Sequence, residues 1–190
     1  RILERHKFYK IYDVPVFYFP KFFHPDPSVK RQSGLLKPEI NNSNVLGSSL
    51  SLPYYKVISK NKDLTLTPIW FDSKTSMLTL EYRQENKNSS LLTDFGFVNG
   101  YKSPTTGKKN SLSHFFLDFD HKLNFEDYIT SNLSIFFEKV SSDQYLNIFD
   151  QYLTKSTIRP SNFNKLSSEI KVSLEHENFN FTTLVQSHEN

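Results

Sequence analysis

Two carboxylates are the residues whose type and spacing best suit chemistry in this sequence. Asp118 and Asp120 stand two positions apart in the run FFLDFDHK, so both would lie on one face of a strand. A glycosidase uses two carboxyl groups across a cleft, at a separation suited to the sugar and with one pKa raised. On a strand of a transmembrane barrel, the same pair would instead point into the water-filled interior. Spacing alone therefore assigns no catalytic role.

The other chemistry-bearing residue types form no site motif. Cysteine is absent, which excludes thiol chemistry, and the six histidines are scattered without a His-x-x-x-His pair, so we expect them on the surface or in loops. The five glycines are isolated and form no phosphate-binding loop. The run Lys7-Phe8-Tyr9-Lys10 is a weak match to a nucleic-acid-binding surface. The sequence predicts no enzyme, no cofactor, no metal site and no nucleic-acid partner.

Alternating strands dominate the chain from Gly34 onward. Their apolar faces are formed by every second residue: Leu64, Leu66, Pro68 and Trp70; Leu78, Leu80 and Tyr82; Phe115, Leu117 and Phe119; Leu133, Ile135 and Phe137; Ile170, Val172 and Leu174. We predict an all-β fold in which about eight or nine strands form an antiparallel meander. No apolar run approaches the ~18 residues that a transmembrane helix needs.

Two all-β architectures fit this alternation, a transmembrane β-barrel and a soluble β-sandwich. Several strands reach the ~9 to 11 residues that cross a bilayer, and longer connections at 99–111 and 140–166 contrast with short turns elsewhere. Six aromatic residues near strand ends are candidates for an interfacial girdle: Trp70, Phe71, Tyr82, Tyr101, Phe125 and Tyr128. These features favour the barrel. The alternative is a soluble extracellular β-sandwich that binds or hydrolyses carbohydrate with Asp118 and Asp120.

A proline-rich segment separates these strands from the start of the chain. Residues 1–19 contain two short aromatic strand patterns, with Pro15 at an edge or bulge. Pro20, Pro25 and Pro27 follow within eight residues, so we expect an irregular linker at 20–33. Residues 1–37 hold eight Lys or Arg against three acidic residues, a net charge of +5, while the rest of the chain carries −2. The basic segment is either a binding surface for an anion or a solvated strand face.

Two further prolines stand inside strand patterns. Pro38 lies in GLLKPEI and Pro53 in SSLSLPYYKVI, and an Asn-rich turn joins the two runs, so we expect them to pair in one hairpin. Proline cannot donate to a β-ladder and is tolerated at edges or bulges. The hairpin is therefore expected to pair weakly, either at a functional seam or as ordinary protection against aggregation.

Four motifs occur in order along the first part of the chain: VPVFYFP, RQSGLLKP, LSLPYY and NKDLTLTP. Together they resemble the LptD family of outer-membrane lipopolysaccharide-assembly proteins, strongly over residues 13–83, moderately over 112–150 and weakly elsewhere. The resemblance implies that residues 1–19 are the last strands of a periplasmic β-jelly roll, 20–33 a linker, and 34–190 the first strands of a large transmembrane barrel. We therefore expect a fragment of a longer protein.

What this resemblance implies is transport rather than catalysis. In the family, lipopolysaccharide leaves a jelly roll and passes through a lateral opening in the barrel wall, at a seam that prolines weaken. Pro38 and Pro53 match those gate positions. The implied partners are lipopolysaccharide, a plug lipoprotein like LptE, a periplasmic bridge protein like LptA, and the outer membrane. The N-terminal part would lie in the periplasm.

Seven residues near the junction are candidates for the substrate path under this resemblance. Four aromatic residues would form an apolar trough for acyl chains: Phe17, Phe19, Phe22 and Phe23. Three basic residues would contact phosphates: Lys30, Arg31 and Lys37. The chain departs from many family members in one respect, because the cysteines that link their jelly roll to the barrel are absent from it.

Overall fold

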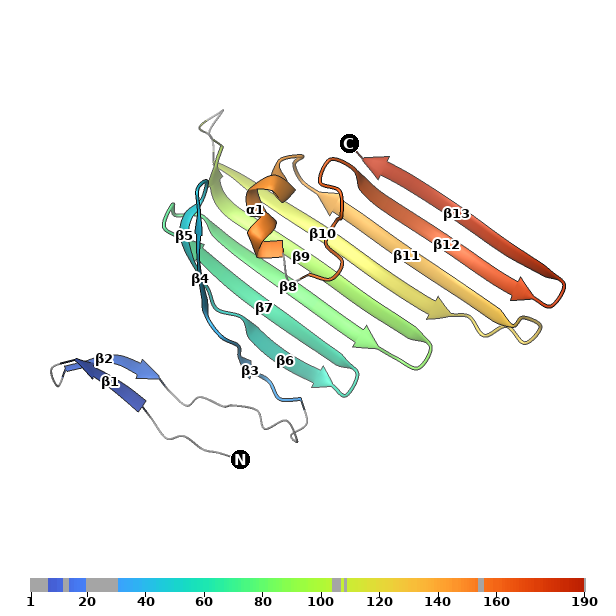
Figure 1. The fold of residues 1–190 in the computed structure, drawn as a ribbon, viewed down its shortest axis with the longest axis horizontal. Helices are drawn as coiled ribbons and strands as arrows, with labels where there is room; N and C mark the ends of the chain where they lie inside the picture. Colours follow the sequence, from blue (N-terminus) through green and yellow to red (C-terminus); the bar gives the residue numbers. More distant parts are fainter. Residues whose placement is uncertain are drawn as a thin grey trace. The chain divides into compact units, whose positions relative to one another are not determined.

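The computed structural model of the chain describes residues 7–11, 14–19, 31–103, 107, 109–153 and 156–189 (Figure 1). The chain divides into two compact units, Arg1–Gly34 and Leu35–Asn190. Within the described ranges, every regular element is a β-strand except one short helix. This composition confirms the all-β fold that the sequence predicts.

One hairpin is described in the first unit. β1 (Lys7–Ile11) pairs antiparallel with β2 (Val14–Phe19), which confirms two short strands in this region. The register shifts between Tyr9 and Lys10, where Lys10 opposes Pro15. A bulge beside Pro15 is the expected consequence of a residue that has no amide hydrogen for the ladder.

The rest of the described chain forms one antiparallel sheet of eleven strands. The strands are β3 (Gly34–Leu35), β4 (Glu39–Ser43), β5 (Gly47–Ser51), β6 (Tyr54–Ser59), β7 (Lys62–Phe71), β8 (Ser76–Glu85), β9 (Ser89–Lys102), β10 (Lys109–Lys122), β11 (Thr130–Val140), β12 (Leu166–His176) and β13 (Phe179–Glu189). From β7 to β13 each strand pairs with the next in sequence, as in the predicted meander. The described sheet has eleven strands rather than the predicted eight or nine, because β3 and β4 are separated at Pro38 and β5 and β6 at Pro53. On the other side of β7 lie β5 with β4, and β6 with β3.

The register of this sheet places apolar residues beside one another on one face, called here the outer face. Leu80, for example, lies between Leu66 and Phe95 in the neighbouring strands. Eight large apolar side chains of this face are between 37% and 49% exposed: Leu50, Trp70, Leu78, Phe95, Phe97, Phe115, Phe137 and Ile170. Because side chains alternate along a strand, the residues between them occupy the inner face. The alternation predicted from sequence is confirmed, and none of the described segments buries the outer face.

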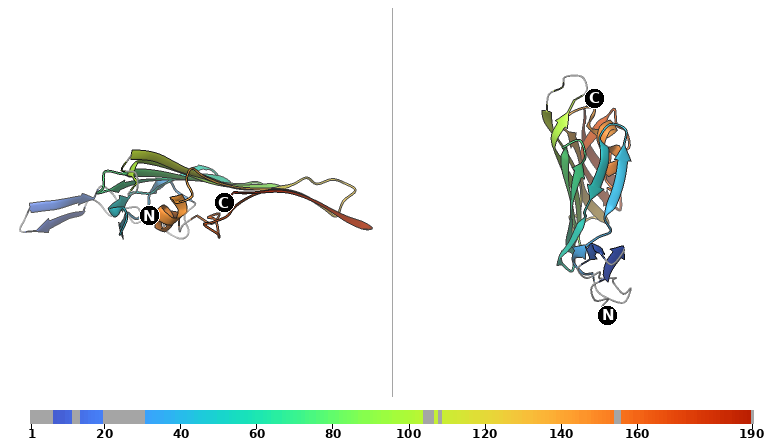
Figure 2. Two further views of the ribbon diagram at one scale, coloured as in Figure 1. Left: turned by 90° about the horizontal axis from the view of Figure 1, so that it is seen from above. Right: turned by 90° about the vertical axis from the view of Figure 1, so that its left-hand side faces the viewer.

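A short helix covers part of the inner face. α1 (Tyr145–Leu153) lies in the connection between β11 and β12, and both views in Figure 2 place it on one side of the sheet. The sequence predicts only a loop at 140–166. A helix forms there because Leu146, Phe149 and Leu153 recur at spacings of three and four residues and are buried together. No helix in the described ranges is long and apolar enough to cross a membrane.

The buried core of the sheet lies between α1 and the inner face. Its residues are Leu46, Ile69, Phe71, Met77, Val98, Tyr101, Leu112, Phe116, Tyr145, Leu146, Phe149, Leu153, Ile158 and Leu166. Phe71 and Tyr101 are each only 6% exposed, so the prediction that they belong to an interfacial girdle is wrong. Both lie on the inner face, where Phe71 packs against the Tyr152 ring of α1 and Tyr101 against the Phe149 ring. Trp70 and Phe125 are each 49% exposed.

The connections between strands lie at both ends of the sheet. The two longer connections predicted from sequence, between β9 and β10 and between β11 and β12, lie at the same end. The short turns at 60–61, 86–88 and 177–178 lie at the opposite end, where β3 begins. The turn at 72–75 is also short, although it lies at the end of the long connections. The turn at 44–46 lies at the same end as well, and the connection at 123–129, at the opposite end, is longer than the one at 103–108 between β9 and β10. The predicted contrast between the two ends is therefore wrong except for the long connection between β11 and β12.

Candidate functional site

Prolines interrupt both strands of the first hairpin of the sheet. Pro38 lies between β3 and β4, and Pro53 lies between β5 and β6. The ladder of β4 and β5 begins just beyond them, where Glu39 opposes Ser51, so the two runs pair in one hairpin as predicted. Across the break the Leu36 amide donates to the Pro53 carbonyl at 2.8 Å. The sequence predicts prolines inside continuous strands, but each strand stops at its proline, which supplies no amide hydrogen.

A third proline extends this interruption into the next strand. The Leu52 amide donates to the carbonyl of Pro68 in β7 at 3.1 Å, but Pro68 has no amide hydrogen with which to return a bond. In the described residues, β5 pairs with β7 only at 49–51 with 69–71, whereas β7 pairs with β8 at nine positions. A short ladder therefore attaches β5 to β7, and pairing with β7 resumes beyond Pro53 in β6. Sequence reasoning placed Pro68 on an apolar strand face and missed its position opposite Leu52, next to Pro53.

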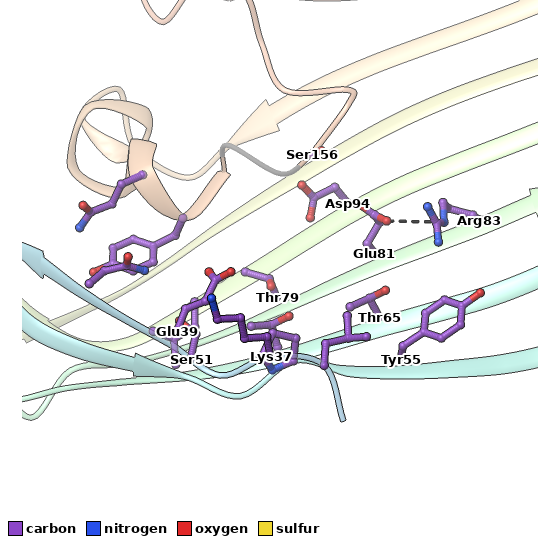
Figure 3. Close-up of a pocket in the computed structure, with 17 residues that line it drawn as sticks. Lys37, Glu39, Ser51, Tyr55, Thr65, Thr79, Glu81, Arg83, Asp94 and Ser156 are labelled. Atoms are coloured by element: carbon purple, nitrogen blue, oxygen red, sulfur yellow. Dashed lines mark ion pairs between the residues drawn. The ribbon is translucent and has the colours of Figure 1, made fainter. Parts of the chain in front are cut away.

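A cavity of about 570 Å³ opens on the inner face beside these prolines (Figure 3). Most of its lining side chains are polar or charged: Lys37, Glu39, Asn41, Ser51, Tyr55, Thr65, Thr67, Thr79, Glu81, Arg83, Asp94, Gln151, Tyr152 and Ser156. Leu36, Pro53 and Ile69 complete the wall. Hydroxyl, amide and carboxylate groups suit a polar ligand with many hydrogen-bonding groups, and they would not favour an acyl chain.

Charged residues of the cavity wall interact across neighbouring strands. Arg83 Nε lies 2.8 Å from Asp63 Oδ1 and 3.6 Å from Glu81 Oε1, and Figure 3 marks the second of these pairs. The side chain of Asp63 is only 2% exposed, so its charge needs a partner. Glu81 and Asp94 oppose each other in the register of β8 and β9. This part of the inner face is therefore polar and charged, unlike the outer face of the same strands.

A buried polar network anchors α1 to the inner face. His114 Nδ1 and the Tyr145 hydroxyl are 2.7 Å apart, and Asp94 Oδ1 lies 3.2 Å from His114 Nε2, although this second pair does not meet hydrogen-bond geometry. Burial, and to a lesser extent the Asp94 carboxylate, raise the pKa of Tyr145 well above its ordinary value. The hydroxyl therefore keeps its proton and shares a hydrogen bond with Nδ1. The ring of Phe116 stacks on His114 at 4.6 Å.

The prediction that all histidines lie on the surface or in loops is wrong for His114, which is 1% exposed. The residue is in β10, on the inner face beneath α1, and its ring is enclosed by aromatic side chains and by Gly96 of β9. A histidine on a strand face is buried only when a distant segment covers it. The alternation of β10 could not predict that α1 would cover His114.

Replacing Gly96 by alanine is expected to displace α1 from the sheet. A Cβ at this position would overlap the His114 ring, at 2.5 Å from Nδ1, and would lie 3.0 Å from the Tyr145 hydroxyl. Overpacking of this kind costs about 1 to 3 kcal/mol. Faster proteolysis of the 141–165 connection in the full-length protein would report the displacement. Gly34→Ala is the matched control, because no atom lies within 4 Å of its Cβ position. Equal protease resistance of the two variants would contradict this role of Gly96.

The remaining residues proposed for the substrate path are only partly described. Phe17 and Phe19 are residues of β2, while Phe22, Phe23 and Lys30 lie outside the described residues. Arg31 is exposed, and Lys37 is both exposed and part of the cavity wall. Of the seven predicted path residues, Lys37 is therefore the one that the described structure places at the cavity.

Asp118 and Asp120 lie on the inner face, as the sequence predicts. Ser134 Oγ donates to Asp120 Oδ1 at 2.5 Å across the β10–β11 pair, and Asp118 opposes Phe136. Neither carboxylate lines the 570 Å³ cavity. Within the described part of the chain, no group of three or more His, Cys, Asp or Glu side chains is arranged to hold a metal ion.

Comparison with known proteins finds several curated relatives, each named LPS-assembly protein LptD. The protein of Psychrobacter arcticus is 31% identical over 142 residues, which are 75% of this chain and 15% of that protein. The protein of Idiomarina loihiensis is 29% identical over 76% of this chain and 18% of its own length. The protein of Legionella pneumophila strain Paris is 28% identical over 95% of this chain and 22% of its own length. No family model matches the chain. The chain thus spans about a fifth of the length of these relatives.

Proposed function

Because the chain belongs to the LptD family, we propose that the protein containing it assembles lipopolysaccharide at the outer membrane and that residues 34–190 are part of its membrane-spanning barrel. The single observation that carries this proposal is the division of the sheet into an exposed apolar outer face and a polar inner face with a cavity. A barrel wall requires such a division, because one face meets hydrocarbon and the other meets water.

The exposed outer face also bears on the alternative architecture. A β-sandwich buries the apolar face of each sheet against a second sheet. Here the side chains of that face remain 37% to 49% exposed, and the described part of the chain supplies no second layer over them. The segment that packs on the sheet in that part, α1 together with the connection that follows it, covers the other face. These observations favour a lipid environment for the outer face over a soluble carbohydrate-binding domain.

The first hairpin is the proposed moving side of a lateral gate, with Pro38 and Pro53 as the residues that weaken it. Both prolines lie where strands stop, and Pro68 removes one more amide donor from the adjoining ladder. Each missing ladder bond is worth about 1 kcal/mol, so a few of them would let a seam part without unfolding a sheet that is continuously paired elsewhere. The interruption of three neighbouring strands supports this part of the proposal.

Seven residues form the proposed substrate path. The aromatic residues Phe17, Phe19, Phe22 and Phe23 would contact acyl chains in the periplasm, and Lys30, Arg31 and Lys37 would contact phosphates. The polar cavity beside Lys37 supports a passage for the sugar portion on the inner face. A plug lipoprotein like LptE and a bridge protein like LptA would bind parts of the full-length protein, and no catalytic step is needed.

Depletion and complementation in cells test this proposal. Depletion of the full-length protein is expected to lower surface lipopolysaccharide, and re-expression of the unaltered protein should restore it. A variant with Lys30→Glu and Arg31→Glu should restore it several-fold less well, because reversed charges repel the phosphates. The measurement is surface-accessible lipopolysaccharide normalised to the amount of folded protein. Unchanged surface lipopolysaccharide after depletion would overturn the function, and full rescue by the variant would overturn the basic path alone.

A further inference from the structure

α1 contacts two parts of the sheet, the continuously paired strands β9 and β10 and the hairpin β4–β5. Its first half is anchored at the centre of the sheet, where Tyr145 meets His114 of β10 and the Phe149 ring packs edge-on against Tyr101 of β9 at 5.8 Å. Leu146, in the same half of the helix, is 1% exposed. These contacts hold the first half of α1 against β9 and β10.

The last turn of α1 extends from this anchor to the first hairpin. The Tyr152 hydroxyl is 2.8 Å from Ser49 Oγ in β5, and Ser49 Oγ is 3.4 Å from the Asn41 carbonyl in β4. Ser49 can donate to that carbonyl only if it accepts from Tyr152, so one chain of hydrogen bonds runs from α1 through β5 to β4. The Tyr152 ring also packs edge-on against Phe71 of β7 at 5.1 Å.

The backbone attachment of the same hairpin is short. Besides three register positions between β5 and β7 in the described residues, the Leu52 amide donates to the Pro68 carbonyl at 3.1 Å. The Asp72 amide donates to the Ser48 carbonyl and the Ser48 amide to Asp72 Oδ2, both at 3.0 Å. Ser49 is 3% exposed. If the Tyr152 hydroxyl were removed, water could not readily replace it as the hydrogen-bond partner of Ser49. Against so few ladder bonds, one buried side-chain bond is a substantial part of what holds the hairpin.

We propose that Tyr152 is a positioning residue that fastens the hairpin β4–β5 to α1, and so sets how readily this hairpin separates from β7. Tyr145, at the start of α1, contacts the continuously paired strand β10, and Tyr152, near its end, contacts the weakly attached hairpin β4–β5. The consequence for transport rests on the proposed function, because only a lateral gate gives movement of this hairpin a role. The fastening itself rests on the contacts of Tyr152 alone.

Hydrogen exchange on the full-length protein tests the fastening directly. Tyr152→Phe keeps the ring against Phe71 but removes the hydroxyl, and amide exchange in Gly47–Ser51 is expected to become about five-fold faster, with exchange in β9 and β10 unchanged. Ser49→Ala should have the same effect, and the double variant should exchange no faster than either single one. Tyr82→Phe is the matched control, since it removes a hydroxyl bonded to Gln84 at 2.8 Å outside the hairpin.

The possible results separate this inference from the proposed function. Unchanged exchange of the β5 amides in both single variants would overturn the fastening, whatever the protein transports. Faster exchange together with altered surface lipopolysaccharide would support the fastening and its role in the gate. Faster exchange with unaltered surface lipopolysaccharide would overturn the role in gating, while the depletion experiment would still decide whether the protein assembles lipopolysaccharide.

Discussion

Leu117→Lys in the full-length protein is expected to reduce insertion into the outer membrane severely, whereas Asp118→Lys in the neighbouring position should be tolerated. Leu117 lies on the outer face opposite Phe137, and Asp118 lies on the inner face opposite Phe136. A lysine facing lipid near the midplane of a barrel costs roughly 2 to 4 kcal/mol, but a lysine facing a hydrated interior costs little. The amount of heat-modifiable, folded protein in outer-membrane fractions measures the effect.

The two variants are matched because they introduce the same side chain one residue apart in one strand. Only the face of the sheet differs, so a general intolerance of lysine in β10 would lower the amount of folded protein for both variants. Equal amounts of folded protein for the two variants would contradict the assignment of the outer face to lipid. A larger loss for Asp118→Lys than for Leu117→Lys would reverse the assignment of the two faces.

Replacing Pro38 and Pro53 together by alanine is expected to tighten the first hairpin and to lower lipopolysaccharide delivery. Each alanine supplies an amide hydrogen that the ladder lacks at that position. Two new bonds at about 1 kcal/mol each would make the separated state of the seam about thirty-fold less populated. Surface lipopolysaccharide in cells that depend on the variant is the measurement, and the amount of folded protein should not fall.

Pro160→Ala is the control for this double substitution. Pro160 is buried in the connection between α1 and β12, outside every strand of the described chain, so its replacement adds no ladder bond to the hairpin. If surface lipopolysaccharide were the same in the double variant as in the unaltered protein, the gate role of Pro38 and Pro53 would have to be abandoned. Adding Pro68→Ala should lower delivery further, because Pro68 adjoins the same interruption.

The sequence by itself determined the strands and their two faces. In β10, Phe115 and Leu117 alternate with Phe116 and Asp118, and the register places these pairs on opposite faces as the alternation predicts. This inference is reliable because side chains along a strand point strictly to alternate sides, whatever the strand pairs with. The prolines of the first hairpin were also evident in sequence, since a missing amide hydrogen is a property of the residue itself.

Only the tertiary structure decided which residues of the inner face are buried and what holds the first hairpin. Phe71, Tyr101 and His114 are covered by α1, which follows β11, far from all three in sequence. Ser49 and Tyr152 are 103 residues apart, and Pro68 adjoins Pro53 only through the register of β7. No local pattern encodes such contacts, because they depend on where a distant segment packs. Local periodicity therefore predicted the strands and the two faces of the sheet, while the packing of α1 on the inner face decided the candidate site.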